Sequence, residues 1–179
     1  LSMQKYQKAG DMLGVATNLK DRGRIYLTYL DFYLRAIDDQ QKALEIFQNE
    51  GDDVSQIETF QNLGLAYEKM ADYRNALEFQ QKALQLAEEI GDETQIALSQ
   101  QYLANIKWKQ DEYQAALQYQ NSALKKFIKM GNEKFQSMAF ATLGLIRRSL
   151  GQAADALEAE NKALELAIKS GDRQDQATI

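Results

Sequence analysis

Residues 51–90 read GDDVSQIETFQNLGLAYEKMADYRNALEFQQKALQLAEEI, and the pattern in this stretch decides the fold. Its first half carries the i, i+3, i+4, i+7 spacing that marks one face of an amphipathic helix, at Phe60, Leu63, Gly64 and Tyr67. A short break follows at residues 70–73, and small and apolar residues then recur at helical spacing as far as Ala87. We therefore predict two helices joined by a short turn, with the second helix packed closely against a neighbour.

The stretch is followed by Gly91 and Asp92, a pair that predicts a helix stop and then a helix start. Glycine adopts the left-handed backbone conformation that closes a helix. An aspartate carboxylate accepts hydrogen bonds from the free backbone N–H groups of the next helix, and Gln95 stands where a capping-box partner does. The sequence therefore predicts a tight corner at this point.

The same pattern occurs four times, at a constant interval of 40 residues. The interval separates the glycines Gly51, Gly91, Gly131 and Gly171, and the alanines Ala43, Ala83, Ala123 and Ala163. Self-similarity at a fixed period of roughly 20–50 residues indicates a stacked-repeat architecture. The first copy holds one extra residue near residues 27–32, because matches before that point need a step of 41 and matches after it a step of 40.

We expect a single array over residues 1–179, and we expect the chain to be a piece of a longer protein. The predicted parts are the tail of a preceding repeat at 1–10, four repeats at 11–50, 51–90, 91–130 and 131–170, and the start of a fifth at 171–179. A two-helix repeat cannot bury its apolar stripe alone, so stacked neighbours must bury it together.

The repeat resembles the tetratricopeptide repeat (TPR), whose pattern is Leu-Gly, a Tyr three residues after that Gly, and then spaced alanines, as in NLGLAYEKMADYRNALEFQQKAL. The 40-residue form is similar to repeats of spindle-orientation adaptors, kinesin light chains and bacterial arrays beside CHAT domains. The resemblance implies an all-α fold, an α-α superhelix (solenoid) of stacked antiparallel helix pairs, with the first helices lining a concave groove. The pattern is broken at Arg22, Lys107 and Arg147, where an apolar residue or Tyr is usual, and we expect looser packing there.

Composition argues against most kinds of chemistry. The chain has no histidine and no cysteine, which are common general bases, nucleophiles and metal ligands. Its net charge of -5 without a basic face argues against nucleic acid as the main partner. No apolar run approaches the ~20 residues that a membrane span needs. We therefore predict a protein that is not an enzyme, has no metal or cofactor, and is cytoplasmic.

The resemblance also implies which residues face the groove, on the first helix of each repeat and off the core stripe. These are Lys20, Arg24, Gln61, Leu65, Glu68, Gln101, Asn105, Trp108, Leu145 and Arg148. Asn105 occupies the position at which many TPR proteins hold an Asn that binds a peptide backbone. Its counterparts are Arg24, Leu65 and Leu145, so a full set of carboxylate-clamp residues is absent.

Four of these positions leave two interpretations open. Trp108, the single tryptophan, is either a packing residue or an aromatic anchor of the groove, since Trp is enriched in binding hot spots. Lys20 and Arg24, one helical turn apart, are either solvated charges or a clamp for an acidic segment. Asn105 is either a ligand contact or a plain polar residue on a wet face.

The function that we predict is a protein–protein interaction scaffold, which binds a peptide or a partner protein segment in the concave groove. The alternative is a regulatory segment of a larger bacterial enzyme or signalling protein, which senses a ligand or peptide and changes curvature. A truncated array exposes an apolar end, so end-to-end self-association also stays open.

Overall fold

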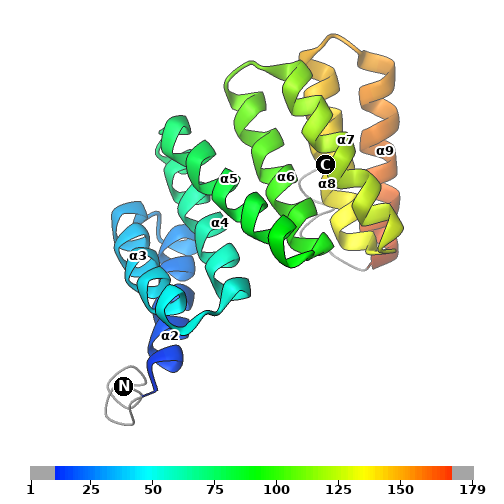
Figure 1. Ribbon diagram of the computed structural model, residues 1–179. Coiled ribbons are helices and arrows are strands. Elements are labelled where there is room, and N and C mark those ends of the chain that lie inside the picture. Colours follow the sequence, from blue (N-terminus) through cyan, green and yellow to red (C-terminus); the bar gives the residue numbers. More distant parts are fainter. Residues whose placement is uncertain (1–10, 171–179) are drawn as a thin grey trace. The chain divides into compact units, whose positions relative to one another are not determined.

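The structure of the protein, a computed structural model, describes residues 11–170. The predicted tail at 1–10 and the predicted start of a fifth repeat at 171–179 lie outside the described residues. All regular structure in residues 11–170 is α-helical (Figure 1). The helices are α2 (Met12–Tyr29), α3 (Tyr33–Glu50), α4 (Asp53–Lys69), α5 (Tyr73–Ile90), α6 (Glu93–Lys109), α7 (Tyr113–Lys129), α8 (Glu133–Ser149) and α9 (Ala153–Ser170).

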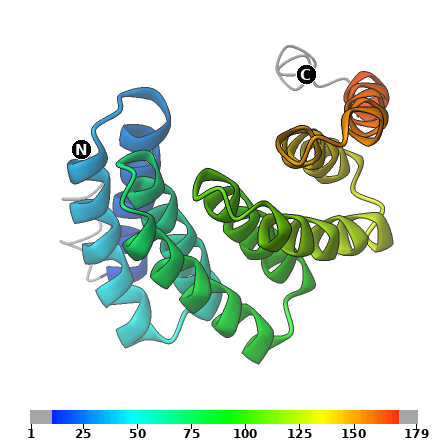
Figure 2. The same cartoon turned by 90° about the horizontal axis from the view of Figure 1, so that it is seen from above.

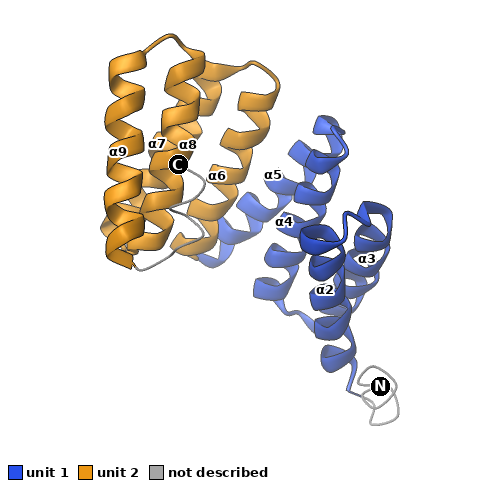
Figure 3. Cartoon of the chain, turned by 180° about the vertical axis from the view of Figure 1, so that it is seen from behind, with its two compact units in different colours: residues 1–91 blue, residues 92–179 orange. Residues whose placement is uncertain are grey.

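The helices pack as consecutive pairs, which we describe as first helices (α2, α4, α6, α8) and second helices (α3, α5, α7, α9). The chain forms two compact units, residues 1–91 and residues 92–179 (Figure 3). Within unit 1, α3 packs against α4, and within unit 2, α7 packs against α8. The pair α8 and α9 lies side by side in both views (Figures 1 and 2). The predicted all-α fold of stacked antiparallel helix pairs is confirmed.

The predicted stop-and-start corners are present at the three Gly positions of the interval that lie within the described residues. Gly51, Gly91 and Gly131 have φ angles of 69°, 72° and 68°, which lie in the left-handed region that residues with a side chain rarely adopt. The Asp92 carboxylate accepts from the N–H groups of Thr94 and Gln95, at 2.9 and 3.0 Å. Local chemistry therefore ends one helix and begins the next, as the sequence indicates.

The extra residue of the first repeat lies between Tyr26 and Phe32. In the second repeat the Asp72 N–H donates to the Tyr67 carbonyl, five residues back, at 2.9 Å. In the first repeat the Phe32 N–H donates to the Tyr26 carbonyl, six residues back, at 3.1 Å. The insertion is therefore absorbed in the last turn of α2, as the change of step predicts.

The core of each unit joins small residues at the helix contacts to larger apolar residues on both the first and the second helices. The triplet alanines Ala43, Ala83, Ala123 and Ala163 are fully buried. In unit 2, Ala123 and Ala159 share one apolar cluster with Phe127 and Leu143. Burial of such apolar surface contributes roughly 25 cal/mol per Å². An alanine at the closest approach lets two helices meet without a void.

A row of buried glutamines on the second helices ties them to the first helices. The Gln80 side chain is fully buried, and its Nε2 donates to the Gln61 carbonyl at 3.0 Å. A Cβ added to Gly64 would lie 2.5 Å from that nitrogen. Gly64, the glycine of the Leu-Gly pattern, therefore makes room for the glutamine. The first repeat uses Gln40 and Gly23 in the same way.

The third repeat shows what happens when that glycine is absent. Ala104 stands in the place of Gly64, and the equivalent glutamine is Gln120. Gln120 remains fully buried, but its Nε2 donates to the Ala139 carbonyl on α8, at 2.7 Å. The glutamine therefore bonds the next pair of helices in place of its own.

Candidate functional site

The candidate face of unit 1 is formed by the first helices α2 and α4. Lys20 on α2 forms an ion pair with Glu58 on α4. The Lys20 side chain is only 13% exposed, and its Nζ lies 5.6 Å from the centre of the Phe47 ring. An acidic ligand would have to displace Glu58 to reach this ammonium group. The Lys20 charge is therefore already engaged within the unit.

Arg24, one turn further along α2, is in a different position. Its side chain is 67% exposed, and its guanidinium lies 3.9 Å from the Asp21 carboxylate on the same helix. Exposed pairs of this kind contribute little, commonly about 0–1 kcal/mol. Of the two predicted clamp residues, only Arg24 presents its charge to solvent.

Three of the predicted groove residues are buried. Gln61 and Glu68 on α4 and Gln101 on α6 are 7%, 6% and 7% exposed. Leu65 is half-buried against the apolar cluster that contains Leu63. Their roles in binding a ligand stay predictions, and their small exposed surface makes them weaker candidates than Arg24. Gln61, Glu68 and Gln101 are polar and lie off the core stripe, so the sequence favoured exposed positions for them. Their burial became visible only in the packed structure.

The candidate face of unit 2 is formed by α6 and α8. Trp108 on α6 links the two helices. The indole Nε1–H donates to Ser149 Oγ on α8, at 2.8 Å, and the Ser149 hydroxyl donates to the Leu145 carbonyl at 3.1 Å. Trp108 is half-buried. The ring is therefore fixed in place by its neighbours while part of its surface stays open. Ser149 was not among the predicted residues, and its place one turn after Leu145 is the signal that could have found it.

Asn105 lies one turn before Trp108 on α6. It is half-buried, and its side-chain amide has no hydrogen-bond partner among residues 11–170. Leu145 on α8 is 42% exposed. Arg148, the remaining predicted residue, forms an ion pair with Glu160 on α9. On its first helices, unit 2 therefore combines an amide without a partner in the described part of the chain, a fixed indole and an exposed leucine.

A family profile described as tetratricopeptide repeat matches residues 14–89 and 56–129, which together span more than half of the chain. The chain belongs to the tetratricopeptide repeat family. No curated protein sequence matches it significantly.

Solved structures with a similar fold include RapI, an aspartyl phosphate phosphatase and a Rap gene regulator. The apo form of RapI has a TM-score of 0.82 and 23% identity, over 97% of this chain and 48% of its own. Aspartyl phosphate phosphatase F from Bacillus subtilis has a TM-score of 0.87 and 20% identity, over 96% and 45%. A plasmid's Rap conjugation gene regulator in complex with a Phr peptide has a TM-score of 0.76 and 15% identity, over 98% and 54%. This chain spans about half the length of these proteins.

The positions that break the TPR pattern are polar contacts in the structure. Arg22 binds the Asp39 carboxylate through two nitrogens, each at 2.6 Å, and Asp39 is buried. That bond raises the pKa of the Arg22 guanidinium. Lys107 pairs with Glu112 at 2.9 Å. At Arg22 a two-pronged ion pair takes the place of apolar contacts, and looser packing at the three positions stays a prediction.

The shifted carboxyl groups of the described part lie in exposed ion pairs and not in a cluster. The neighbouring ammonium groups of Lys82, Lys126 and Lys162 lower the pKa values of Glu78, Glu93 and Glu165 respectively. No group of three or more acidic side chains in residues 11–170 could hold a metal ion. No helix among the same residues is long and apolar enough to cross a membrane.

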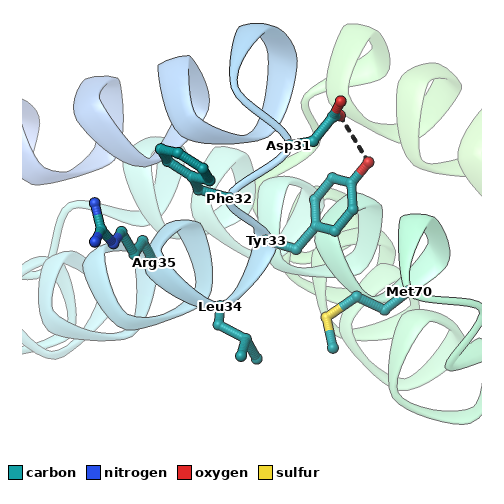
Figure 4. A pocket seen from close by; sticks show the side chains of 6 residues that line it. All are labelled: Asp31, Phe32, Tyr33, Leu34, Arg35 and Met70. Carbon is teal, nitrogen blue, oxygen red and sulfur yellow. Dashed lines mark hydrogen bonds between the residues drawn. The ribbon is translucent and has the colours of Figure 1, made fainter.

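A pocket of about 400 Å³ lies at the turn between α2 and α3, with Met70 at its edge (Figure 4). The Tyr33 hydroxyl donates to Asp31 Oδ1 at 2.7 Å, and the Arg35 guanidinium lies 5.1 Å from the centre of the Phe32 ring. Leu34 is 72% exposed. The pocket lies beside the extra residue of the first TPR, and none of the predicted groove residues lines it.

Proposed function

We propose that this TPR chain is a protein-interaction scaffold, which binds an extended peptide or a partner protein segment on the first-helix face of unit 2. The observation that carries the proposal is the Asn105 amide, which has no hydrogen-bond partner among residues 11–170, one turn from the fixed indole of Trp108. An asparagine amide can donate to a peptide carbonyl and accept from a peptide N–H at the same time. An indole that is already ordered loses little freedom when it contacts a ligand.

Leu145 extends this site with apolar surface beside Ser149, which accepts the hydrogen bond from Trp108. Unit 1 has a candidate contact of its own, because the exposed guanidinium of Arg24 could bind an acidic side chain of a partner. The solved Rap regulator in complex with a Phr peptide supports the proposal, because a protein of this fold binds a peptide.

We infer that the chain binds and does not catalyse. One neighbour of similar fold is named a phosphatase, so phosphatase activity is the relevant alternative. The sequence has no histidine or cysteine, and the described part has no acidic cluster that could hold a metal. Acyl phosphate turnover by the purified chain would contradict this inference.

A second candidate role is a peptide-sensing segment of a larger regulator, and one observation favours it. The chain spans about half the length of RapI and of the phosphatase. An array of this size could therefore be the sensing part of a longer protein of similar length. The 40-residue interval further suggests the TPR subclass of spindle-orientation adaptors, kinesin light chains and CHAT-associated arrays. We further propose that the protein is cytoplasmic and does not bind nucleic acid. We also propose that the array can associate end to end with a second copy.

The test uses peptides selected from a display library against the wild-type chain. Asn105→Ala and Trp108→Ala should each weaken binding of a selected peptide by about tenfold or more, as hot-spot truncations do. Gln118→Ala, an exposed change on the second helix α7, is the matched control and should leave affinity unchanged. Circular dichroism checks that all variants keep their helicity. Equal affinity for all variants would place binding elsewhere and refute the proposed site.

A further inference from the structure

One position of the second helices differs in all four repeats. It is occupied by Asp39, Phe79, Tyr119 and Ala159. In unit 1 the Phe79 ring stacks on the Tyr67 ring, with centres 5.5 Å apart and an angle of 5° between the planes. Phe79 also contacts the Phe60 ring, at 6.3 Å between centres. Tyr67 and Phe79 pack against the apolar cluster that joins Leu63 on α4 to Ala36 and Ile37 on α3.

The same corner of unit 2 has lost two of its three rings. Ala159 stands in the place of Phe79, and Arg147 in the place of Tyr67, while Phe140 keeps the place of Phe60. A pocket of about 570 Å³ is present here, between α7, α8 and α9. Its lining includes Ala159, Arg147 and Phe140, together with Leu124 and Leu143 from the core. Replacement of a ring by a methyl group therefore coincides with an open pocket.

Arg147 is positioned to receive a ring. Its Nη1 donates to the Asp155 carbonyl at 3.1 Å, and no carboxylate among residues 11–170 pairs with it. A guanidinium without a carboxylate partner stacks favourably on an aromatic face. In unit 1 Phe79 stacks on the residue that corresponds to Arg147. A ring in the unit 2 pocket would therefore meet Arg147 on one side and Phe140 on the other.

The rim of the pocket carries an unpaired acid. In unit 1 Glu78 pairs with Lys82, at 2.7 Å. In unit 2 the counterpart of that lysine, Lys162, pairs with Glu165 at 2.9 Å. Glu158, the counterpart of Glu78, has no ion-pair partner within the described part of the chain. A ligand with a cation beside its aromatic group would complete this pair.

We propose that the pocket between α7, α8 and α9 binds an aromatic side chain of a partner protein, with a lysine or arginine next to it in the partner's sequence. The partner ring would take the place that Phe79 fills in unit 1, and its basic neighbour would pair with Glu158. The lining of this pocket comes from α7, α8 and α9 and does not include Asn105 or Trp108. It adds a second recognition element to the chain.

The first experiment measures binding of N-acetyl-phenylalaninamide to the full chain by NMR titration. The methyl signals of Ala159, Leu124 and Leu143 should shift, because these side chains line or adjoin the pocket. Ala159→Phe should weaken binding at least tenfold, since the added ring occupies the site. Ala154→Phe, an exposed change on the same helix, is the matched control and should leave binding unchanged.

Further probes test each part of the proposal. N-acetyl-leucinamide should bind several-fold more weakly than the phenylalanine amide, and equal binding would refute the preference for a ring. N-acetyl-Phe-Lys-amide should bind more tightly than N-acetyl-Phe-Glu-amide, and Glu158→Gln should abolish that difference. Toluene tests the pocket without a backbone. If toluene binds and the phenylalanine amide does not, the pocket is closed to a protein side chain and the proposal is wrong.

Two controls keep this test independent of the proposed function. Trp108→Ala removes the first-helix anchor, and it should leave binding of the phenylalanine amide unchanged. Ala159→Phe should leave binding of library-selected peptides at the Asn105 face unchanged. Loss of both interactions in either variant, with normal helicity, would show that the two sites are not separate.

Discussion

The corner around Phe79 in unit 1 and the corner around Ala159 in unit 2 occupy the same register of the repeat but are filled differently. Unit 1 closes its corner with stacked rings, and unit 2 leaves a pocket beside Arg147. Both units nevertheless keep the buried triplet alanines and the glutamine between their helices. The stability of a stacked repeat is a sum over repeats and interfaces, so one corner can lose packing while the helix pair persists.

The first repeat fills the position that corresponds to Phe79 in a third way, with an ion pair. Asp39 stands at the Phe79 position and is buried, and the bidentate ion pair with Arg22 compensates its charge. A charge without a partner in such a place would be very costly. The comparison therefore shows that this position accepts a ring, an ion pair or a pocket, and that only the pocket leaves room for a ligand.

Phe79→Ala should give the largest effect, because it would turn the closed corner of unit 1 into the open form. We expect a loss of about 3 kcal/mol, near the lower end for a buried Phe because Phe79 is half-buried. Native-state hydrogen exchange should show faster exchange in α4 and α5 and little change in α8 and α9. Equal acceleration in both units would mean that the corner does not act locally.

Arg22→Ala should rank second, because it leaves the buried Asp39 carboxylate without its cation. The expected loss is about 2 kcal/mol, less than for a fully buried pair because the Arg22 side chain is 44% exposed. The double variant Arg22→Leu with Asp39→Phe copies the second repeat at both positions. Urea unfolding should place it within about 1 kcal/mol of the wild type. A double variant as unstable as Arg22→Ala would show that the corner needs the ion pair itself.

Ala159→Phe combined with Arg147→Tyr would give unit 2 the closed corner of unit 1. Filling the pocket should stabilise unit 2 by about 1 kcal/mol, as cavity-filling changes commonly do. Thermal unfolding measures the gain, and Ala154→Phe with Arg147→Tyr is the control that adds the ring outside the pocket. A loss of stability would mean that the helices of unit 2 cannot accommodate the ring.

The smallest expected effect is the loss of stability at low pH. Lys126 pairs with Glu93 and lowers the pKa of that carboxyl below its ordinary value of 4.5. The folded state then binds the proton less tightly than the unfolded state, so the contribution is present above about pH 4.5 and is lost as the pH falls through the lowered pKa. Unit 1 has the apolar residues Ile46 and Leu86 in the places that correspond to Lys126. The Lys126–Glu93 pair therefore gives unit 2 an acid-sensitive contribution that unit 1 lacks at the corresponding positions.

Glu93→Gln tests this difference through urea midpoints at several pH values. The variant should be less stable than the wild type at pH 7, and the gap should close on acidification. Glu158→Gln, which changes an acid without an ion-pair partner in the described part of the chain, is the control and should show a smaller gap. A gap that is the same at every pH would exclude the Glu93 titration as its cause.

The helices could be predicted closely from the sequence because their determinants are local. The 3.6-residue period, the Gly-Asp corners and the position of the extra residue each depend on neighbours within one or two turns. The face of the candidate site could be predicted only in part. Asn105 and Trp108 lie as a half-exposed pair, whereas Gln61 and Gln101 are buried. Helical spacing gives the direction of a side chain but not what packs on it.

By itself, the sequence of this protein determined that it folds into repeated helix pairs with alanines at their contacts, since period, caps and small residues act over short distances. The tertiary structure decided which charges are already paired, as Lys20 is with Glu58, 38 residues away. It also decided that the loss of a ring at Ala159 leaves a pocket and not a collapsed corner. Both outcomes depend on side chains that meet only after the helices have packed.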